Sequence, residues 1–156
     1  MPAESDTSDQ QLGVDAVRAL ARVARVLERA TAGLGMAQYR VLSAIASGEG
    51  RASRVARRFA LGKPTVSAAV EALCRDGLVE RKESADDQRA VELSLTAAGS
   101  ALLESTEVEM VRELERLCEL TSWGRDAVAM LAQLGDAVDE VRAERGVPGD
   151  QALPGR

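Results

Sequence analysis

The sequence predicts a mainly α-helical fold with one small β-hairpin. The chain is 46% hydrophobic but holds only one Trp, one Tyr and one Phe, so Ala, Val and Leu must fill the interior. That composition favours closely packed helices over a β-sandwich. Apolar residues recur at spacings of three and four along most of the chain, whereas strict alternation of apolar and polar residues is confined to residues 91–95.

The N-terminal end predicts a disordered tail followed by a long amphipathic helix. Residues 1–12 are polar and acidic and show no apolar periodicity, as is typical of a tail. Residues 14–33 repeat apolar side chains at helical spacing, and Gly33 and Gly35 are expected to end that helix. The apolar stripe along it consists of Val17, Leu20, Ala24 and Leu27.

Three further helices are expected before the hairpin, at 36–47, at 52–61 and from Pro64 onward. A proline at the first helical position has its φ angle pre-set and loses no hydrogen bond. Gly62 separates the last two helices, and Gly77 ends the third. The side chains expected to point inward are Val41, Leu42, Ile45, Val55, Ala56, Phe59, Val66, Val70 and Leu73.

The hairpin is predicted from residues 78–83, which alternate weakly, and residues 91–95, which alternate strictly. Residues 84–89 are polar and form the expected turn. Thr96 is suited to cap a helix over residues 97–121, since its hydroxyl can accept from a free backbone N–H. The apolar residues of that helix are Leu102, Leu103, Met110, Leu114, Leu117 and Cys118.

A last helix is predicted over residues 124–144, after Thr121 and Ser122. Residues 146–156 carry Gly and Pro at a density typical of a disordered tail. The apolar residues of the last helix step by four and three in turn, which is the pattern of a seam against another helix. These residues are Ala127, Leu131, Leu134, Val138 and Val141.

Charge is distributed unevenly along the chain, whose net charge is −5. Residues 100–119 hold six glutamates and two arginines. Residues 51–70 contain no acid, which gives the chain a basic middle between acidic flanks. The cations of that middle stretch are Arg51, Arg54, Arg57, Arg58 and Lys63.

Several classes of function are disfavoured by what the sequence lacks. It contains no His, which is the commonest general base and zinc ligand, and its two cysteines, Cys74 and Cys118, form no close-spaced motif. We therefore expect no metal, no cofactor and no catalytic residue, and we interpret both cysteines as small core residues. No apolar run long enough to span a membrane and no secretory signal segment are present, which favours a cytoplasmic protein.

The order of the elements predicts a helix-turn-helix followed by a hairpin wing. The second helix of such a unit can enter the DNA major groove, about 12 Å wide. Basic side chains around the turn can neutralise phosphates, while Thr65 and Ser67 lie near the helix N-terminus, where they can meet phosphate or base edges. Arg89 at the wing tip can enter the minor groove, held by Asp87. Each signal alone also fits a solvated surface, and only the combination is specific.

Two stretches, "KPTVSAAVEALCRDGLVER" and "SADDQRAVELSLTAAG", resemble the recognition helix and wing of the MarR family of bacterial transcription regulators. The wing of that family reads Asp-Pro-x-Asp-Arg-Arg, followed by an alternating strand that ends in Leu-Thr-x-x-Gly. The matching residues are Asp87, Arg89, Leu95, Thr96 and Gly99, and the departures are Ser84, Ala85 and Gln88.

The resemblance implies a homodimer that presents two winged helices to a palindromic operator on double-stranded DNA. It also implies a repressor that a small lipophilic or phenolic effector releases. Residues 36–96 would form the DNA-binding domain, and 13–35 together with 97–145 the dimerisation region. The DNA-binding residues would be Arg54, Arg57, Arg58, Lys63, Pro64, Thr65, Ser67, Ala68, Arg75, Asp87, Gln88 and Arg89, and the dimerisation residues Val17, Leu20, Leu114, Leu117, Leu131, Leu134, Val138 and Val141.

Two other classes of function compete with this interpretation. A helical dimeric interaction module with weak or lost DNA binding is favoured by the net charge of −5 and by Gln88, which stands where relatives have an arginine. An enzyme is disfavoured by the missing histidine and by the lack of a nucleophile motif or phosphate loop. An effector pocket near Leu34, Met36 and Tyr39 is conceivable by analogy, but plain packing is the preferred interpretation of those residues.

Overall fold

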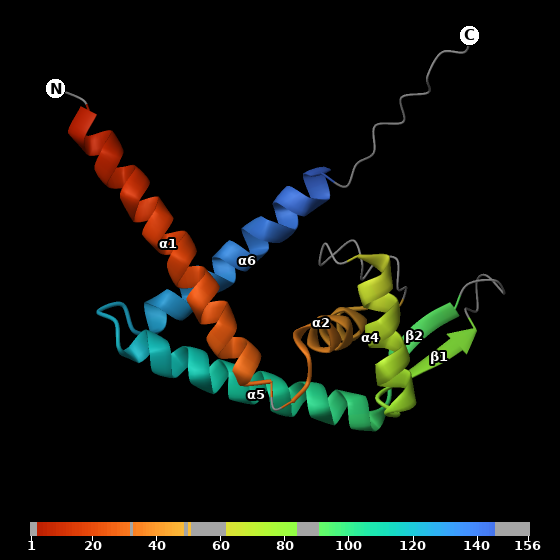
Figure 1. Cartoon of the computed structure of the whole chain (residues 1–156). Helices are drawn as coiled ribbons and strands as arrows, with labels where there is room; N and C mark the ends of the chain where they lie inside the picture. Colours follow the sequence, from red (N-terminus) through yellow and green to blue (C-terminus); the bar gives the residue numbers. More distant parts are fainter. Residues whose placement is uncertain (1–2, 32, 49, 51–61, 84–90, 146–156) are drawn as a thin grey trace, which may run out of the picture.

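The computed structural model describes residues 3–31, 33–48, 50, 62–83 and 91–145 (Figure 1). The expected helix at 52–61, the wing turn at 84–89 and the tail at 146–156 lie outside these residues. The predicted mainly α-helical fold with one antiparallel hairpin is confirmed. The elements are α1 (Ala3–Arg29), α2 (Met36–Ala46), α4 (Lys63–Arg75), β1 (Val79–Glu83), β2 (Val91–Leu95), α5 (Ala97–Glu119) and α6 (Arg125–Arg145).

The prediction of a disordered N-terminal tail is wrong for residues 3–12, because α1 begins at Ala3. Acidic side chains near a helix N-terminus are stabilised by the helix dipole, and this stretch contains three of them. One turn later, Gln11 Nε2 donates to Asp15 Oδ2 at 3.1 Å. The helix also ends earlier than expected, at Arg29, where the Thr31 hydroxyl donates to the Glu28 carbonyl at 2.8 Å.

The core lies between α2, α4, the hairpin and the first half of α5. Leu42 of α2 and Leu73 of α4 are both 0% exposed, and Val79 and Leu93 close the core from the two strands. The described residues predicted to point inward are all buried, so the helical periodicity identified them correctly. They are Val41, Leu42, Ile45, Val66, Val70 and Leu73.

Helix α5 connects two differently built parts of the molecule (Figure 1). Its first half packs against α2 and β2, and its second half contacts α1 and α6. We call α2, α4, β1 and β2 the winged segment, and α1 and α6 the arms. The arms extend away from α5 in different directions (Figure 1), and the side chains of residues 8–18 and 132–141 are exposed. None of the described helices is long and apolar enough to cross a membrane.

Candidate nucleic-acid interface

Helix α4 buries one side and presents a polar side to solvent. Its buried residues follow helical spacing and anchor the helix on the core: Val66, Ala69, Val70 and Leu73. The other side carries six of the residues that the sequence assigned to DNA binding, and all six are exposed. They are Lys63, Pro64, Thr65, Ser67, Ala68 and Arg75.

The N-terminus of α4 is built to leave backbone donors available. Gly62 is the N-cap and offers no side-chain acceptor, and Pro64 lies in the first turn. The first N–H groups of a helix have no partner within the helix, and together with the helix dipole they attract anions. With Lys63 and Thr65 exposed beside it, this end of α4 can bind a phosphate.

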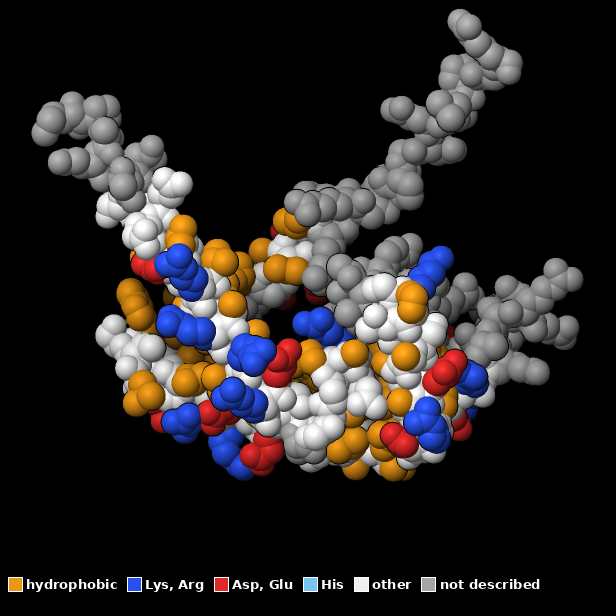
Figure 2. Space-filling view, viewed as in Figure 1, with side chains coloured by type: hydrophobic (Ala, Val, Ile, Leu, Met, Phe, Trp, Pro, Cys, Tyr) orange, Lys and Arg blue, Asp and Glu red, His pale blue; other side chains and the backbone are white. Residues whose placement is uncertain are grey.

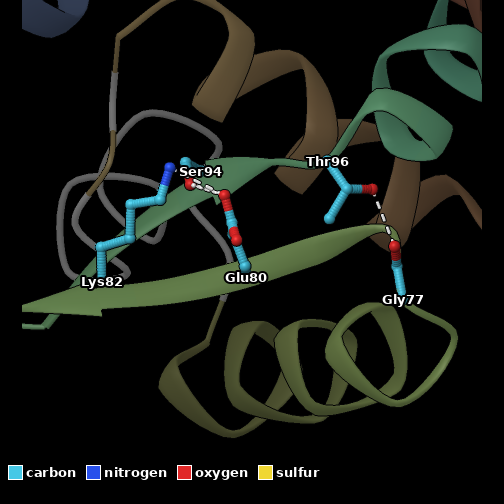
Figure 3. Close-up of polar contacts among 5 residues, drawn as sticks. All are labelled: Gly77, Glu80, Lys82, Ser94 and Thr96. Carbon is cyan, nitrogen blue, oxygen red and sulfur yellow. Dashed lines mark hydrogen bonds and ion pairs between the residues drawn. The ribbon is translucent and has the colours of Figure 1, made fainter.

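A junction of four residues joins the end of α4, the start of β1 and the start of α5: Gly77, Leu78, Thr96 and Gly99. Figure 3 shows the hydrogen bond between Thr96 and Gly77. Thr96 Oγ1 donates to the Gly77 carbonyl at 2.7 Å and accepts from the Gly99 N–H at 3.0 Å, as the predicted α5 cap requires. Gly77 has φ of +69°, which favours glycine, and the Thr96 N–H donates to the Leu78 carbonyl at 3.1 Å.

Gly99 permits the close approach at this Thr96 junction. A Cβ atom at residue 99 would lie only 2.0 Å from the Leu78 carbonyl oxygen. Since these contacts tie α4, the hairpin and α5 to one another, they fix the position of α4 and the hairpin relative to α5.

The hairpin has an apolar face toward the core and a polar face toward solvent. β1 and β2 pair in antiparallel register, with Val79 opposite Leu95 and Glu80 opposite Ser94. On the polar face, Ser94 Oγ donates to Glu80 Oε1 at 3.1 Å, and Lys82 Nζ lies 2.7 Å from the same oxygen (Figure 3). The hydrogen bond from Lys82, followed by that from Ser94, lowers the pKa of Glu80 below its ordinary value.

A backbone contact from Gly50 supports the hairpin from the other edge of β2. The Leu93 N–H donates to the Gly50 carbonyl at 2.7 Å, so Gly50 lies alongside the strand. A Cβ at residue 50 would lie 2.7 Å from Glu92 Cγ. No local pattern in the sequence could have signalled the partner of this glycine, 43 positions away in "VELSL".

The charged side chains of the described interface are mixed in sign. Lys63 and Arg75 lie at the two ends of the exposed face of α4, with Glu71 between them, and Arg81 and Lys82 are exposed on β1. Glu71 was not predicted to be a DNA-binding residue, although its spacing of four from Ser67 and Arg75 gave the signal. Six of the assigned residues lie outside the described chain: Arg54, Arg57, Arg58, Asp87, Gln88 and Arg89.

The residues assigned to dimerisation fall into two groups. Leu114 and Leu117 of α5 and Leu131 of α6 are half-buried. The other five lie on the arms and are exposed, from 41% for Val138 to 67% for Val17. This exposed group is Val17, Leu20, Leu134, Val138 and Val141.

The remaining candidate residues pack rather than form a site. Cys118 is buried, Cys74 and Tyr39 pack against the core, and Leu34 is part of it. Burial, followed by the charge of Glu107, raises the pKa of Tyr39 above its ordinary value. Within the described parts of the chain, no three His, Cys, Asp or Glu side chains are grouped so that they could hold a metal ion.

Helix α4 is held on a core, the antiparallel hairpin follows it directly, and the capped long helix α5 follows the hairpin. This arrangement defines a winged-helix protein. A sequence model of the MarR family matches residues 32–90. The chain is 30% identical to the transcriptional repressor CouR, which was solved bound to a 23-mer DNA duplex. This match covers 86% of this chain and 99% of the CouR chain, and its TM-score is 0.67. The chain belongs to the MarR family, whose members are transcription regulators and not enzymes.

Other solved structures share the fold at lower identity. A MarR family transcription regulator is 20% identical with a TM-score of 0.70, covering 92% of this chain and 97% of that one. A mutant MarR from E. coli, complexed with operator DNA, is 21% identical with a TM-score of 0.59, covering 79% of this chain and 91% of that one. Comparison with curated protein sequences finds no match.

Proposed function

We propose that this chain is a homodimeric, sequence-specific DNA-binding transcription regulator in the bacterial cytoplasm. The outward face of α4 carries the proposal. Six assigned residues are exposed on it while the opposite side of the same helix is buried, which is the arrangement that a recognition helix needs. CouR bound to a duplex and E. coli MarR bound to operator DNA support the proposal by similarity.

Five of these six residues have a direct role in the proposed complex. Lys63 and Arg75 neutralise phosphates, and Thr65 and Ser67 contact base edges or phosphates near the helix N-terminus. Ala68 is small and apolar and suits a thymine methyl group. From outside the described chain, Arg54, Arg57 and Arg58 add phosphate contacts, and Asp87, Gln88 and Arg89 bring the wing to the minor groove.

The homodimer is supported by the apolar surface of the arms. Large apolar side chains that are 39–71% exposed follow α1, and others that are 41–62% exposed follow α6. Contiguous apolar surface of this kind on a protein marks an interaction site. A two-fold dimer would cover it and would place two copies of α4 about 34 Å apart, one helical turn of DNA. The residues are Leu12, Val14, Val17, Leu20, Met130, Leu134, Val138 and Val141.

Repression of a palindromic operator and release by a small lipophilic or phenolic effector complete the proposal. Similarity to CouR, which is described as a transcriptional repressor, supports repression. A two-fold dimer favours a palindrome because each copy reads the same half-site. The effector is supported by the family resemblance alone.

A helical interaction module with weak DNA binding is the second candidate. The net charge of −5, the Gln88 departure and the acid on the α4 face favour it. It differs from the first candidate in one measurable property, which is the affinity of the dimer for duplex DNA.

Fluorescence anisotropy with a duplex from the region upstream of the protein's own gene separates the two candidates. A regulator binds this duplex in preference to a scrambled one. The logarithm of its affinity also falls linearly with the logarithm of salt concentration, by about 0.9 for each phosphate neutralised. Arg89→Ala should weaken binding sharply at all sites. Equal, weak binding to both duplexes would favour the interaction module.

A further inference from the structure

Glu71 lies near the middle of the outward face of α4. The buried residues of this helix form one stripe, and at about 3.6 residues per turn Glu71 falls roughly 150° around the axis from the centre of that stripe. Ser67 lies one turn before it and Arg75 one turn after it, and all three side chains are exposed. Glu71 is the only acid of α4, so it interrupts a face that is otherwise basic or uncharged.

The Glu71 carboxylate makes no hydrogen bond or ion pair within the described ranges of the chain. Arg75 follows it by four residues, which is a spacing at which Glu and Arg can pair on a helix. Glu80, Glu109 and Glu113, in contrast, each have an oxygen within 2.7 Å of a Lys or Arg nitrogen. An unpaired carboxylate keeps both oxygens available to accept from a donor on a partner molecule.

The neighbours of Glu71 leave its carboxylate accessible. Ala68, one turn before it, and Ala72, the next residue, are both small and reach less far from the helix axis. The two cations of the face lie about 12 Å before Glu71, at Lys63, and about 6 Å after it, at Arg75. If these cations contact phosphates, Glu71 lies between the phosphate contacts, where a recognition helix faces the base edges.

In the major groove, one base edge suits an ionised carboxylate better than the others. A carboxylate accepts hydrogen bonds but donates none, and phosphates repel it. Guanine presents acceptors at N7 and O6, thymine presents an acceptor and a methyl group, and adenine presents its amino donor next to the acceptor N7. Cytosine presents its N4 amino donor and no acceptor. A glutamate at this place therefore favours cytosine.

We propose that Glu71 is a specificity-determining residue that accepts a hydrogen bond from the N4 amino group of a cytosine at one position in each operator half-site. The inference rests on the proposed DNA-binding function and adds which base this side chain selects. Without that cytosine, the carboxylate faces acceptors and phosphates, so its charge weakens binding to other sequences. Glu71 thus lowers overall affinity for DNA and raises the discrimination between sequences.

Selection from a random duplex library, followed by sequencing, measures the base preference at each position of the half-site. The wild-type protein should select cytosine at one position, and replacing this C·G pair by T·A should weaken binding about tenfold in anisotropy titrations. E71Q should prefer adenine at the same position, because Gln pairs with adenine N6 and N7. Preferences at the other positions should stay unchanged, an outcome that a misfolded protein could not give.

E104Q is the matched control, because it removes the same charge from an exposed glutamate on α5. It should keep the cytosine preference, and loss of the preference in E104Q would overturn the role of Glu71. An E71Q protein that selects the wild-type sequence unchanged, or that is weakened equally on every duplex, would also overturn this role and leave the DNA-binding function intact. A wild-type protein that selects no sequence would instead overturn the proposed function.

Discussion

The winged segment and the arms use the same kinds of apolar residue in opposite ways. In the winged segment, Leu42 and Leu73 are fully buried within one chain. On the arms, Val17 is 67% exposed and Leu134 is 49% exposed, and Figure 2 shows hydrophobic side chains on the surface there. This difference indicates that the winged segment completes its core within a single chain, whereas the arms leave apolar faces exposed, which the proposed homodimer would cover.

Truncation of one leucine in each region gives the largest expected contrast. Leu42→Ala leaves a cavity in the core and should lower the free energy of unfolding by about 2–5 kcal/mol at any protein concentration. Leu134→Ala should act through dimer stability, so its effect in urea denaturation should depend on protein concentration. If the loss of stability in Leu134→Ala does not depend on protein concentration, the contrast between the winged segment and the arms would be contradicted.

Glycine substitutions test how firmly the winged segment is joined to α5. Gly99→Ala forces a Cβ against the Leu78 carbonyl, so we expect a loss of about 1–3 kcal/mol in stability and weaker DNA binding. Gly135→Ala is the control, because a Cβ there meets nothing within 4 Å. On an exposed helix it should be neutral or stabilise by up to about 1 kcal/mol. Thermal denaturation and anisotropy measure both variants, and equal behaviour would contradict the role given to Gly99.

Charge changes on α4 should alter DNA binding and leave the arms unaffected. Arg75→Ala should weaken binding to all duplexes alike and reduce the salt slope by about 1, as expected for one lost phosphate contact. Glu71→Gln removes an acid from the same face and should strengthen binding to scrambled DNA. Anisotropy titrations at several salt concentrations report both effects. Unchanged slopes in both variants would mean that α4 does not face the duplex.

The smallest expected effect is a change in the pKa of Tyr39, which lies where the winged segment meets α5. Tyr39 of α2 is the only tyrosine, and burial followed by the charge of Glu107 raises its pKa above 10.0. Because the fold favours the neutral phenol, this contribution to stability is complete below pH 10 and is lost as pH rises through the folded pKa. An absorbance titration should therefore have its midpoint above 10.0, and Glu107→Gln should lower that midpoint. An unchanged midpoint in the variant would exclude the Glu107 contact.

The sequence predicted best those elements whose signals are local. The strict alternation predicted the observed bounds of β2 at 91–95, and the capping residue Thr96 predicted the observed start of α5. Helical spacing also placed Val66, Val70 and Leu73 on the inward side of α4, where they are buried. These features depend on neighbours within a few positions along the chain, which a single sequence displays.

Features that depend on distant contacts could not be predicted. The hydrogen bond from Leu93 to Gly50, and that from Thr96 to Gly77, join positions with no shared local pattern. The extension of α1 to Ala3 was missed for a different reason. Its first turns are polar and lie beyond α5, so no apolar stripe marks them. The partners of the arms are equally invisible to periodicity, which identifies an apolar face but not what covers it.

Sedimentation velocity of the protein titrated onto the upstream duplex tests the central claim most directly. We expect two chains, each of 16.5 kDa, to bind one duplex together, with no complex that contains a single chain. A protein that sediments as one chain, alone or on DNA, would contradict the claim.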